Sequence, residues 1–393
     1  MSDRPAMVGC LVAVLAATAP SAIASDGHLL IGRDHQVHSV RLVRINDRSL
    51  VYGDAAGGLK TVAIEQCVAL LDSEAGPAAP GGGLLRLADG QRFPGEALSG
   101  GRPADDVLVW IHPLLGRMEV PLDRIESVIF ADRAALPAMK SPRAADVLLL
   151  ANGDELEGFV TALGDPITID VSNGVPAGGG QTIEIPLSRA AAVRMITPPR
   201  KPTGWRLWLT SGTVVDVARI VLSEDGFVQL VGLPFLTEQQ PKQVPLSALA
   251  AVLFDPEALS PFGALAPTRV QGPPTRYVVP PPRALDDFAP LGLSRVEFRG
   301  PVTVRYDLVS GPMYFLAEAR LSRMARSWGD CELVIRDDEQ EVFRARLNAE
   351  HSIASIGIAL HGSQLTIEIT EGSNGPIQDH VVLHRAMLLS AQP

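Results

Sequence analysis

The chain has 393 residues, of which 46% are hydrophobic and 20% are charged, and its net charge is −10. This composition excludes a globally disordered chain, because it offers enough apolar side chains for packed cores. The negative net charge argues against a nucleic-acid-binding protein, since such a protein must attract phosphates. With 36 Gly, 32 Pro and only 5% aromatic residues, the chain favours short strands joined by many turns over long helices.

Residues 1–24 have the features of a secretory signal peptide. Arg4 precedes an apolar run at 7–17, and Ala22 and Ala24 follow it in a small-x-small pattern. The run is too short to cross a bilayer of about 30 Å as a helix, and this order of features is typical of a cleaved signal. We therefore expect an exported protein, whether periplasmic, cell-surface or secreted, with no membrane span in the mature chain. An uncleaved anchor and a cytosolic helix are the alternatives.

One motif occurs four times between residues 62 and 254. It reads VPLDRIESVIF at 120–130, IPLSRAAAVRM at 185–195 and VPLSALAAVLF at 244–254, with a weaker copy, VAIEQCVALLD, from residue 62. The starts are separated by 58, 65 and 59 residues, which is a nearly constant period. The apolar positions are kept while the polar positions drift, so the motif indicates a repeated fold and not a catalytic signature.

Within each motif we expect a strand, a one-turn bend and a short final strand. Pro121 cannot donate to a ladder, so its strand should place that position at an edge or outward. Asp123 and the matching Ser188 and Ser247 should cap the single helical turn through a side-chain oxygen. A strand that runs into a tight turn precedes each motif. The pattern predicts four small β units at 27–72, 83–130, 146–196 and 205–254.

The unit pattern, L-x-L-x-[DN]-G followed by V-P-L-x-x-I-x-x-V-x-F, resembles that of Sm-like and SH3-like small β-barrels. The resemblance implies four tandem barrels. RNA binding, which Sm-like rings perform, does not carry over because the loops lack a basic cluster. A unit of about 50 residues is marginal alone, and the linkers between units are short, so we expect a compact array. Separate barrels and units that share strands both remain open.

After the repeats the sequence changes character twice. Residues 255–286 are rich in Pro and show no period, which predicts a semi-rigid linker. Residues 287–393 hold about eight short runs of apolar or alternating residues, with a turn signal at 337–340. This density of strands predicts a β-sandwich of the jelly-roll type. The whole chain is therefore expected to be all-β.

The C-terminal region resembles the NPCBM family of carbohydrate-binding modules, which have a galactose-binding-like jelly-roll fold. The resemblance rests on the order of GPMYFLA, GDCELVIRDDEQEVF, IGIALHGSQLTIEI and NGPIQDHVVLHRAML. It implies a sandwich that binds carbohydrate. A structural Ca²⁺ ion is implied by the resemblance alone, and no other cofactor is expected.

The sequence offers little for catalysis. His380 and His384 have the spacing of a zinc helix, but the Glu of HExxH is absent and the context is a strand. No GxSxG elbow, dinucleotide fingerprint or P-loop occurs. Neighbouring carboxylates lie in expected turns, where they point apart or into solvent. Cys67 and Cys331 are 264 positions apart and are expected to be buried free thiols. We therefore predict a protein that is not an enzyme and has no metal ligands.

For sugar binding, an exposed aromatic face and hydrogen-bonding side chains are needed. Trp328, in the loop MARSWGDC, is the aromatic candidate, and it could instead cover the edge of the sandwich. The polar candidates are Asn374, Asp379, His380 and Arg385. The sequence thus predicts a glycan-binding module displayed on a repeat array. The alternative is a structural or protein-interaction protein of the cell envelope that binds no sugar, and a glycan or an envelope protein is the expected partner.

Overall fold

The computed structural model describes residues 27–54, 57–76, 78, 81–98, 106–130, 145–171, 181–223, 225–236, 242–273, 278–309, 311–375 and 378–390. The expected signal peptide, residues 1–24, lies outside these ranges. Across the described residues the fold is all-β, with single 3-10 turns and no α-helix. No helix in these ranges is long and apolar enough to cross a membrane.

The strands from residue 28 to residue 253 fall into four units of similar order, in which several strands lead to one 3-10 turn and a last strand. Unit 1 contains β1 (His28–Gly32), β2 (Val37–Ile45), β3 (Ser49–Gly53), β4 (Leu59–Ala63), η1 (Ile64–Gln66) and β5 (Cys67–Asp72). Unit 2 contains β6 (Gly83–Leu87), β7 (Arg92–Ala97), β8 (Val107–His112), β9 (Gly116–Pro121), η2 (Leu122–Arg124) and β10 (Ile125–Ile129).

The other two units follow the same plan. Unit 3 contains β11 (Asp146–Leu150), β12 (Glu155–Ala162), β13 (Ile167–Val171), β14 (Gln181–Ile185), η4 (Leu187–Arg189) and β15 (Ala190–Arg194). Unit 4 contains β16 (Trp205–Leu209), β17 (Val214–Val217), β18 (Arg219–Leu222), β19 (Phe227–Val231), β20 (Lys242–Pro245), η5 (Leu246–Ala248) and β21 (Leu249–Leu253).

In each unit the first strand pairs with the last strand, antiparallel, through β1–β5, β6–β10, β11–β15 and β16–β21. The motif supplies this closing strand, and Val120, Ile125 and Val128 of unit 2 are fully buried. The predicted cap is wrong, because the 3-10 turn begins at Leu122 with Pro121 at its N-cap and no side chain caps it. The likeness to Sm-like and SH3-like barrels stays a prediction.

The last strands also join the units in two pairs. Strand β5 pairs with β21 and places Leu70 opposite Val252, and β10 pairs with β15 and places Val128 opposite Val193. All four residues occupy the ninth position of the motif. Equivalent residues that face each other across an antiparallel pair define a local twofold axis. The units are therefore joined edge to edge by strand pairing, unit 1 with unit 4 and unit 2 with unit 3.

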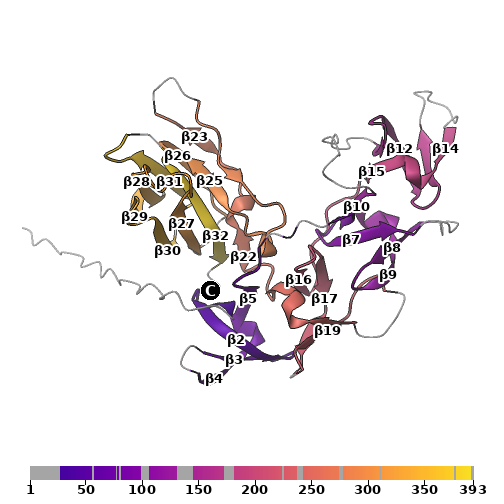
Figure 1. Cartoon of the computed structure of the whole chain (residues 1–393), viewed down its shortest axis with the longest axis horizontal. Coiled ribbons are helices and arrows are strands. Elements are labelled where there is room, and N and C mark those ends of the chain that lie inside the picture. The colour runs from indigo at the N-terminus through magenta and orange to yellow at the C-terminus, as the bar shows by residue number, and fades with distance from the viewer. Residues whose placement is uncertain are drawn as a thin grey trace, which may run out of the picture.

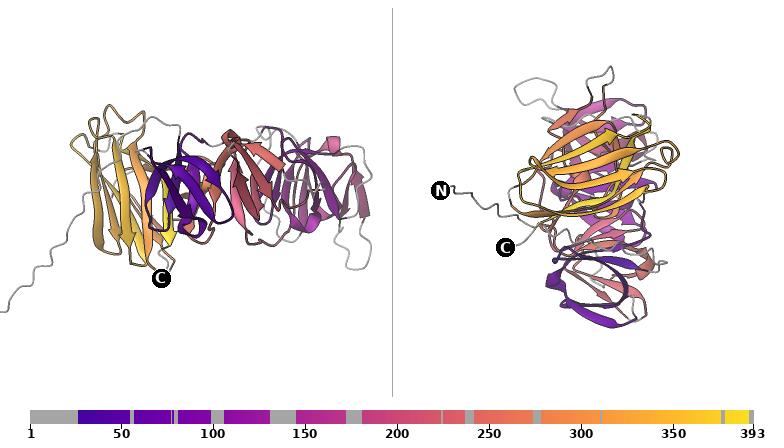
Figure 2. Two further views of the ribbon diagram at one scale, coloured as in Figure 1. Left: turned by 90° about the horizontal axis from the view of Figure 1, so that it is seen from below. Right: turned by 90° about the vertical axis from the view of Figure 1, so that its left-hand side faces the viewer.

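Unit 4 also contacts unit 2, so the spatial order of the array is 1–4–2–3, as Figure 2 shows in its left view. Val214 pairs with Arg92 across this contact, and the imidazole of His112 bonds to the hydroxyl of Thr213 at 2.8 Å. Nδ1 of His112 accepts two backbone N–H groups, so Nε2 is the donor to Thr213. Burial lowers the pKa of His112 to about 4, and the ring is neutral at pH 7.

The C-terminal domain has two facing sheets with an apolar core between them. One sheet has the order β24-β25-β32-β27-β30, with β22 also paired to β32, and the other has the order β23-β26-β31-β28-β29. The strands are β22 (Leu259–Pro261), β23 (Arg269–Gln271), β24 (Arg283–Ala284), β25 (Val296–Arg299), β26 (Val302–Asp307), β27 (Met313–Leu321), β28 (Cys331–Asp337), β29 (Gln340–Leu347), β30 (Ile353–Leu360), β31 (Gln364–Glu371) and β32 (His380–Ser390). Cys331 of this core and Cys67 of unit 1 are buried free thiols.

The expected linker, residues 255–286, is part of this domain. Its three short strands, β22, β23 and β24, pair with β32, β26 and β25. Phe262 is 1% exposed, and its ring lies 4.7 Å from the ring of Tyr306 and 5.3 Å from that of Phe315. The Pro-rich composition suits such short peripheral strands, where a missing N–H breaks no central ladder. The linker interpretation is therefore wrong for the described residues of this segment.

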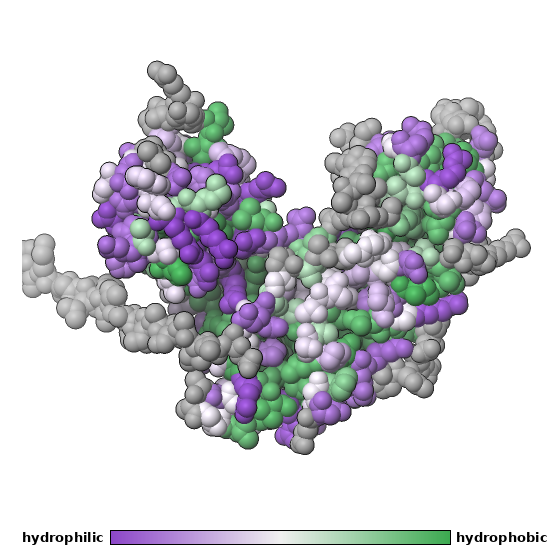
Figure 3. Space-filling view, in the orientation of Figure 1, coloured by the Kyte–Doolittle hydropathy of each residue, from purple (hydrophilic) through white to green (hydrophobic). Residues whose placement is uncertain are grey.

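A second apolar cluster joins the C-terminal domain to units 1 and 4. It includes Leu71 of unit 1, Trp208 and Leu253 of unit 4, and Met387 and Leu389 of β32. Figure 1 shows the sandwich beside the strands of unit 1. The face seen in Figure 3 is mostly hydrophilic over the C-terminal domain and more apolar over the repeat units. The buried cluster fixes the sandwich on the array.

Candidate ligand-binding site

Trp328 is displayed by a tightly turned loop between β27 and β28. The loop folds as two successive turns, in which the N–H of Ala325 donates to Ser322 O at 2.9 Å and that of Trp328 donates to Ala325 O at 3.2 Å. The side chain of Ala325 is buried and anchors the turns, whereas Trp328 is 66% exposed. The structure thus presents the indole to solvent, and Trp328 does not cover the sandwich.

Asp330 fixes the end of this loop. Its carboxylate accepts two hydrogen bonds from Arg346, each 2.8 Å long, and one from the N–H of Ser373 at 2.7 Å. The bonds from Arg346 and then Ser373 hold the pKa of Asp330 at about 2, so the group is ionised. Gly372 is needed beside it, since a Cβ there would lie 2.2 Å from Asp330 O. The loops at 322–330 and 371–375 are thereby joined.

Asn374 and Trp328 come together in the structure. The side-chain amide of Asn374 donates to Trp328 O at 3.1 Å, which ties the loop at 371–375 to the aromatic residue. Asn374 is itself exposed and keeps its carbonyl oxygen and one N–H for other partners. It therefore lies where the sequence reasoning expects a polar contact.

Asp379 lies beneath this end of the domain and is fully buried. Neither carboxylate oxygen has a hydrogen-bond partner among the described residues. Burial raises the pKa of Asp379 to about 6. The carboxylates of Asp330 and Glu371 raise it further, whereas the nearby backbone amide of Asp330 lowers it in part, although it is not within hydrogen-bonding geometry. Its backbone oxygen accepts the N–H of Gly300 at 2.8 Å. The side chain is thus part of the floor under the loop and is closed to solvent.

His380 begins β32 at the same end. Its backbone oxygen accepts the N–H of Ser322, and its ring lies 4.0 Å from a carboxylate oxygen of Glu297. The ring is partly exposed. Trp328, Asn374, Asp379 and His380 are therefore brought to one end of the sandwich.

Arg385 lies elsewhere. It has a positive φ of 50° at a bulge in β32, and its guanidinium donates to Ser73 O of unit 1 at 2.7 Å. Five residues of strand separate it from His380, which is about 16 Å. Arg385 belongs to the joint between the sandwich and the array.

The sequence reasoning missed other groups on the Trp328 loop. Arg323 and Arg326 are both exposed there, and Met324 is 85% exposed. Ile353, which pairs with Arg320 at the same end of β27, is 50% exposed. A usable signal was present, because SRMARSW carries two arginines three positions apart and no acidic residue.

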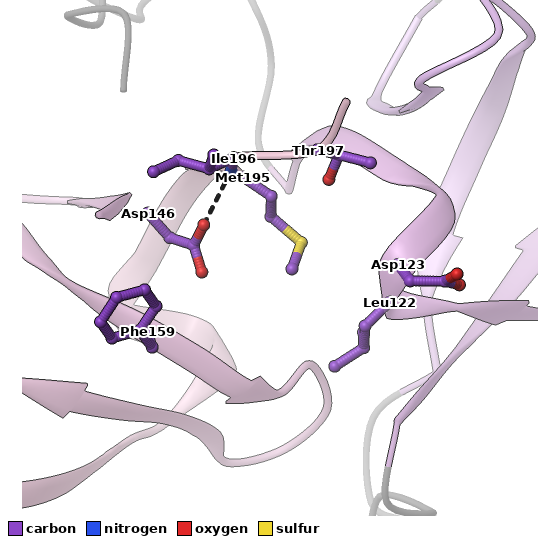
Figure 4. Close-up of a pocket in the computed structure, with 7 residues that line it drawn as sticks. All are labelled: Leu122, Asp123, Asp146, Phe159, Met195, Ile196 and Thr197. Carbon is purple, nitrogen blue, oxygen red and sulfur yellow. Dashed lines mark hydrogen bonds between the residues drawn. The ribbon is translucent and has the colours of Figure 1, made fainter. Parts of the chain in front are cut away.

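Two of the cavities lined by described residues lie away from this loop. One, of about 460 Å³, lies between units 2 and 3 and is lined mainly by apolar side chains, including Phe159, Met195 and Ile196. In Figure 4 the carboxylate of Asp146 bonds to the backbone of Ile196, at 2.8 Å, and Asp123 points away from the other side chains. Asp146 also accepts the N–H of Val160 at 2.9 Å, so its two oxygens are both occupied.

The other cavity, of about 450 Å³, lies where units 2 and 4 meet the C-terminal domain. Its arginines hold this joint together. Arg206 of unit 4 is held by Asp216 of the same unit and donates to Asp89 O of unit 2 at 2.6 Å, and Arg92 of unit 2 donates to Asp287 O at 3.2 Å. Among the residues that the structure describes, no three His, Cys, Asp or Glu side chains are grouped closely enough to hold a metal ion.

Comparison with known proteins gives only distant structural similarity. No protein-family model matches the chain, and no curated protein matches it. A CBM51 from a Clostridium perfringens GH95 protein, in complex with methyl-galactose, is 10% identical, with coverage of 33% of this chain and 99% of that chain and a TM-score of 0.27.

Two further solved structures illustrate the range. The CBM51-2 and INT domains of C. perfringens ZmpB, with GlcNAc, are 8% identical over 44% of this chain and 37% of that chain, with a TM-score of 0.29. An exo-β-1,3-galactanase from Phanerochaete chrysosporium, with β-1,3-galactotriose, is 12% identical over 88% and 82%, with a TM-score of 0.19. At these TM-scores the likeness assigns neither a family nor a ligand to this chain.

Proposed function

We propose that this is an exported, non-catalytic protein whose C-terminal domain binds carbohydrate through Trp328, while the repeat units hold that domain in a fixed position. The observation that carries the proposal is an indole that is 66% exposed on a loop tied down at both ends. The C–H face of a pyranose ring packs against an aromatic face, and a preordered aromatic loses little entropy when a ligand binds.

Hydrogen-bonding groups surround the indole. The free carbonyl oxygen of Asn374 and the exposed hydroxyl of Ser327 lie on the two joined loops. Sugar hydroxyls both donate and accept, so such neutral groups can orient a ring that lies on the indole. The sugar would contact the loops at 322–330 and 371–375.

Other parts of the proposal rest on the sequence. Export follows from the signal-like residues 1–24, and the absence of catalysis follows from the lack of catalytic motifs. We also propose that the C-terminal domain is NPCBM-like and that the four units are Sm-like or SH3-like barrels. A structural Ca²⁺ ion is not required by it.

Glycan-array binding tests the proposal. The protein should be the mature chain from Ser25. A shorter fragment that begins at residue 285, after the expected linker, would lack β22, β23, β24 and Phe262. We expect wild-type protein to bind a subset of glycans and Trp328→Ala to bind them about tenfold more weakly or worse, a loss of about 1.4 kcal/mol. Phe227→Ala is the matched control, because it removes an aromatic residue that is 43% exposed in unit 4.

The control should bind like wild type. Absence of any glycan binding by wild-type protein, together with specific capture of a cell-envelope protein, would replace carbohydrate binding by the alternative structural role. Equal binding by wild type and Trp328→Ala would remove Trp328 from the site.

A further inference from the structure

The Trp328 loop also carries two exposed arginines. Arg323 and Arg326 make no hydrogen bond or ion pair with any residue in the part of the chain that the structure describes. Both belong to the two turns that display Trp328. From this we infer that the site recognises an anionic sugar, one that carries a carboxylate or a sulfate; the inference rests on the carbohydrate binding proposed above.

What sets Arg323 and Arg326 apart is their place on the loop that displays Trp328. Several other arginines of the domain are paired with acids within hydrogen-bonding reach, whereas Arg269, Arg283 and Arg305 have no such pair among the described residues. The pairs include Arg295–Asp286, Arg299–Glu297, Arg320–Glu318, Arg336–Glu368, Arg344–Glu332 and Arg346–Asp330. A guanidinium left without an acid beside an exposed aromatic is available for a ligand.

The loop of the indole carries two exposed guanidinium groups although the chain is acidic overall. Asp330, the one acid of the loop, is neutralised by its bidentate pair with Arg346. Asp379 is buried and closed to solvent. The exposed acids of the adjoining described segments, Glu350 and Glu371, form no hydrogen bond or ion pair with Arg323 or Arg326. An anionic ligand would therefore meet two guanidinium groups that form no ion pair with a described acid.

The spacing of the arginines suits one ligand. They are three positions apart, and each is the second residue of its turn. Guanidinium binds carboxylate and sulfate through paired N–H groups, whereas a neutral hydroxyl gains less from it. The indole would hold the ring of the sugar, and the arginines would hold its acidic substituent.

The test compares matched sugars. Binding of the mature chain to oligogalacturonate, sulfated galactan and neutral galacto-oligosaccharide is measured in 50 mM and 500 mM NaCl. At low salt we expect at least one acidic sugar to bind about tenfold or more tightly than the neutral sugar, and the preference to shrink at high salt. The Arg323→Gln, Arg326→Gln double variant should lose most of the preference and keep its affinity for the neutral sugar.

The control is a second double variant of equal charge. Arg269→Gln, Arg283→Gln removes two exposed arginines from β23 and β24, and it should keep the preference. Equal loss in both double variants, or acidic binding that survives Trp328→Ala, would show unspecific attraction and overturn the inference. Trp328-dependent binding of the neutral sugar with no acidic preference would overturn it too, but would leave the proposed function standing. Absence of binding to all sugars would overturn both.

Discussion

Two carboxylates under the Trp328 loop show how strongly the surroundings of a residue set its role. Asp330 is paired with Arg346, and its pKa is held at about 2, whereas burial without a partner raises that of Asp379 to about 6. The ionised carboxylate of Asp330 therefore stabilises the loop, whereas that of Asp379 opposes folding whenever it is ionised. The sequence predicts Asp379 to be a polar contact for the ligand, but it does not show that the side chain is buried.

We expect Asp379→Asn to stabilise the protein at pH 8 and to have little effect at pH 4. The pKa of Asp379 is about 6 in the folded chain and lies near 4 when unfolded, so the penalty grows as pH rises from about 4 to 6 and is complete above. The gain at pH 8 should be on the order of 2 kcal/mol. Urea unfolding at both pH values measures it.

Asp330→Asn is the control, and at pH 8 it should destabilise the protein instead of stabilising it. Because the pKa of Asp330 is lowered in the fold, its stabilising effect is present at pH 8 and is lost as pH falls toward 2. If Asp379→Asn destabilises the protein equally at both pH values, the assignment of Asp379 as a buried carboxylate without a hydrogen-bond partner is wrong.

At the scale of the element, the repeated motif is a joining strand. The local pattern of the sequence predicted its strand, bend and strand, and the structure has β9, η2 and β10 in that order. It could not predict which last strands pair, because Leu70 and Val252 are 182 positions apart and nothing local specifies that register. For the same reason the order 1–4–2–3 could not be predicted.

The ninth motif position should couple units in a pairwise way. Val128 and Val193 are directly opposite and fully buried, so each Val→Ala change should cost roughly 1–3 kcal/mol. In a double-mutant cycle the pair should show a coupling of at least about 0.5 kcal/mol, whereas Val128 with Val252, which lies in the other pair of units, should add within about 0.5 kcal/mol. Additivity in both cycles would contradict the pairing of units 2 and 3.

For the whole molecule, the sequence predicted the all-β fold and the sandwich, and misplaced one boundary. Residues 255–286 were assigned to a linker because Pro and Gly conceal short strands from pattern analysis. Phe262 carried little signal there, since a lone aromatic residue has no period, yet its ring enters the core between the two sheets. Four of the five candidate site residues converge at one end of that sandwich, and Arg385 joins it to unit 1.

Substitution in the supposed linker separates the two interpretations. Phe262→Ala should cost about 3–5 kcal/mol, because it leaves a cavity beside Tyr306 and Phe315. Val278→Ala, in the same segment but 96% exposed, should change the free energy of unfolding by less than about 0.5 kcal/mol. Chemical denaturation of the mature chain measures both, and equal, negligible effects would restore the linker interpretation.

The central claim is that Trp328 contacts the sugar, and its own fluorescence tests this most directly. Trp110 and Trp208 are buried and Trp205 is partly exposed, whereas Trp328 is 66% exposed and should dominate quenching by acrylamide. Titration with the sugar selected on the array should protect the wild-type protein from quenching and shift its emission to shorter wavelength. Both changes should vanish in Trp328→Phe. Saturable binding that leaves the quenching of wild-type protein unchanged would place the sugar elsewhere and contradict the account.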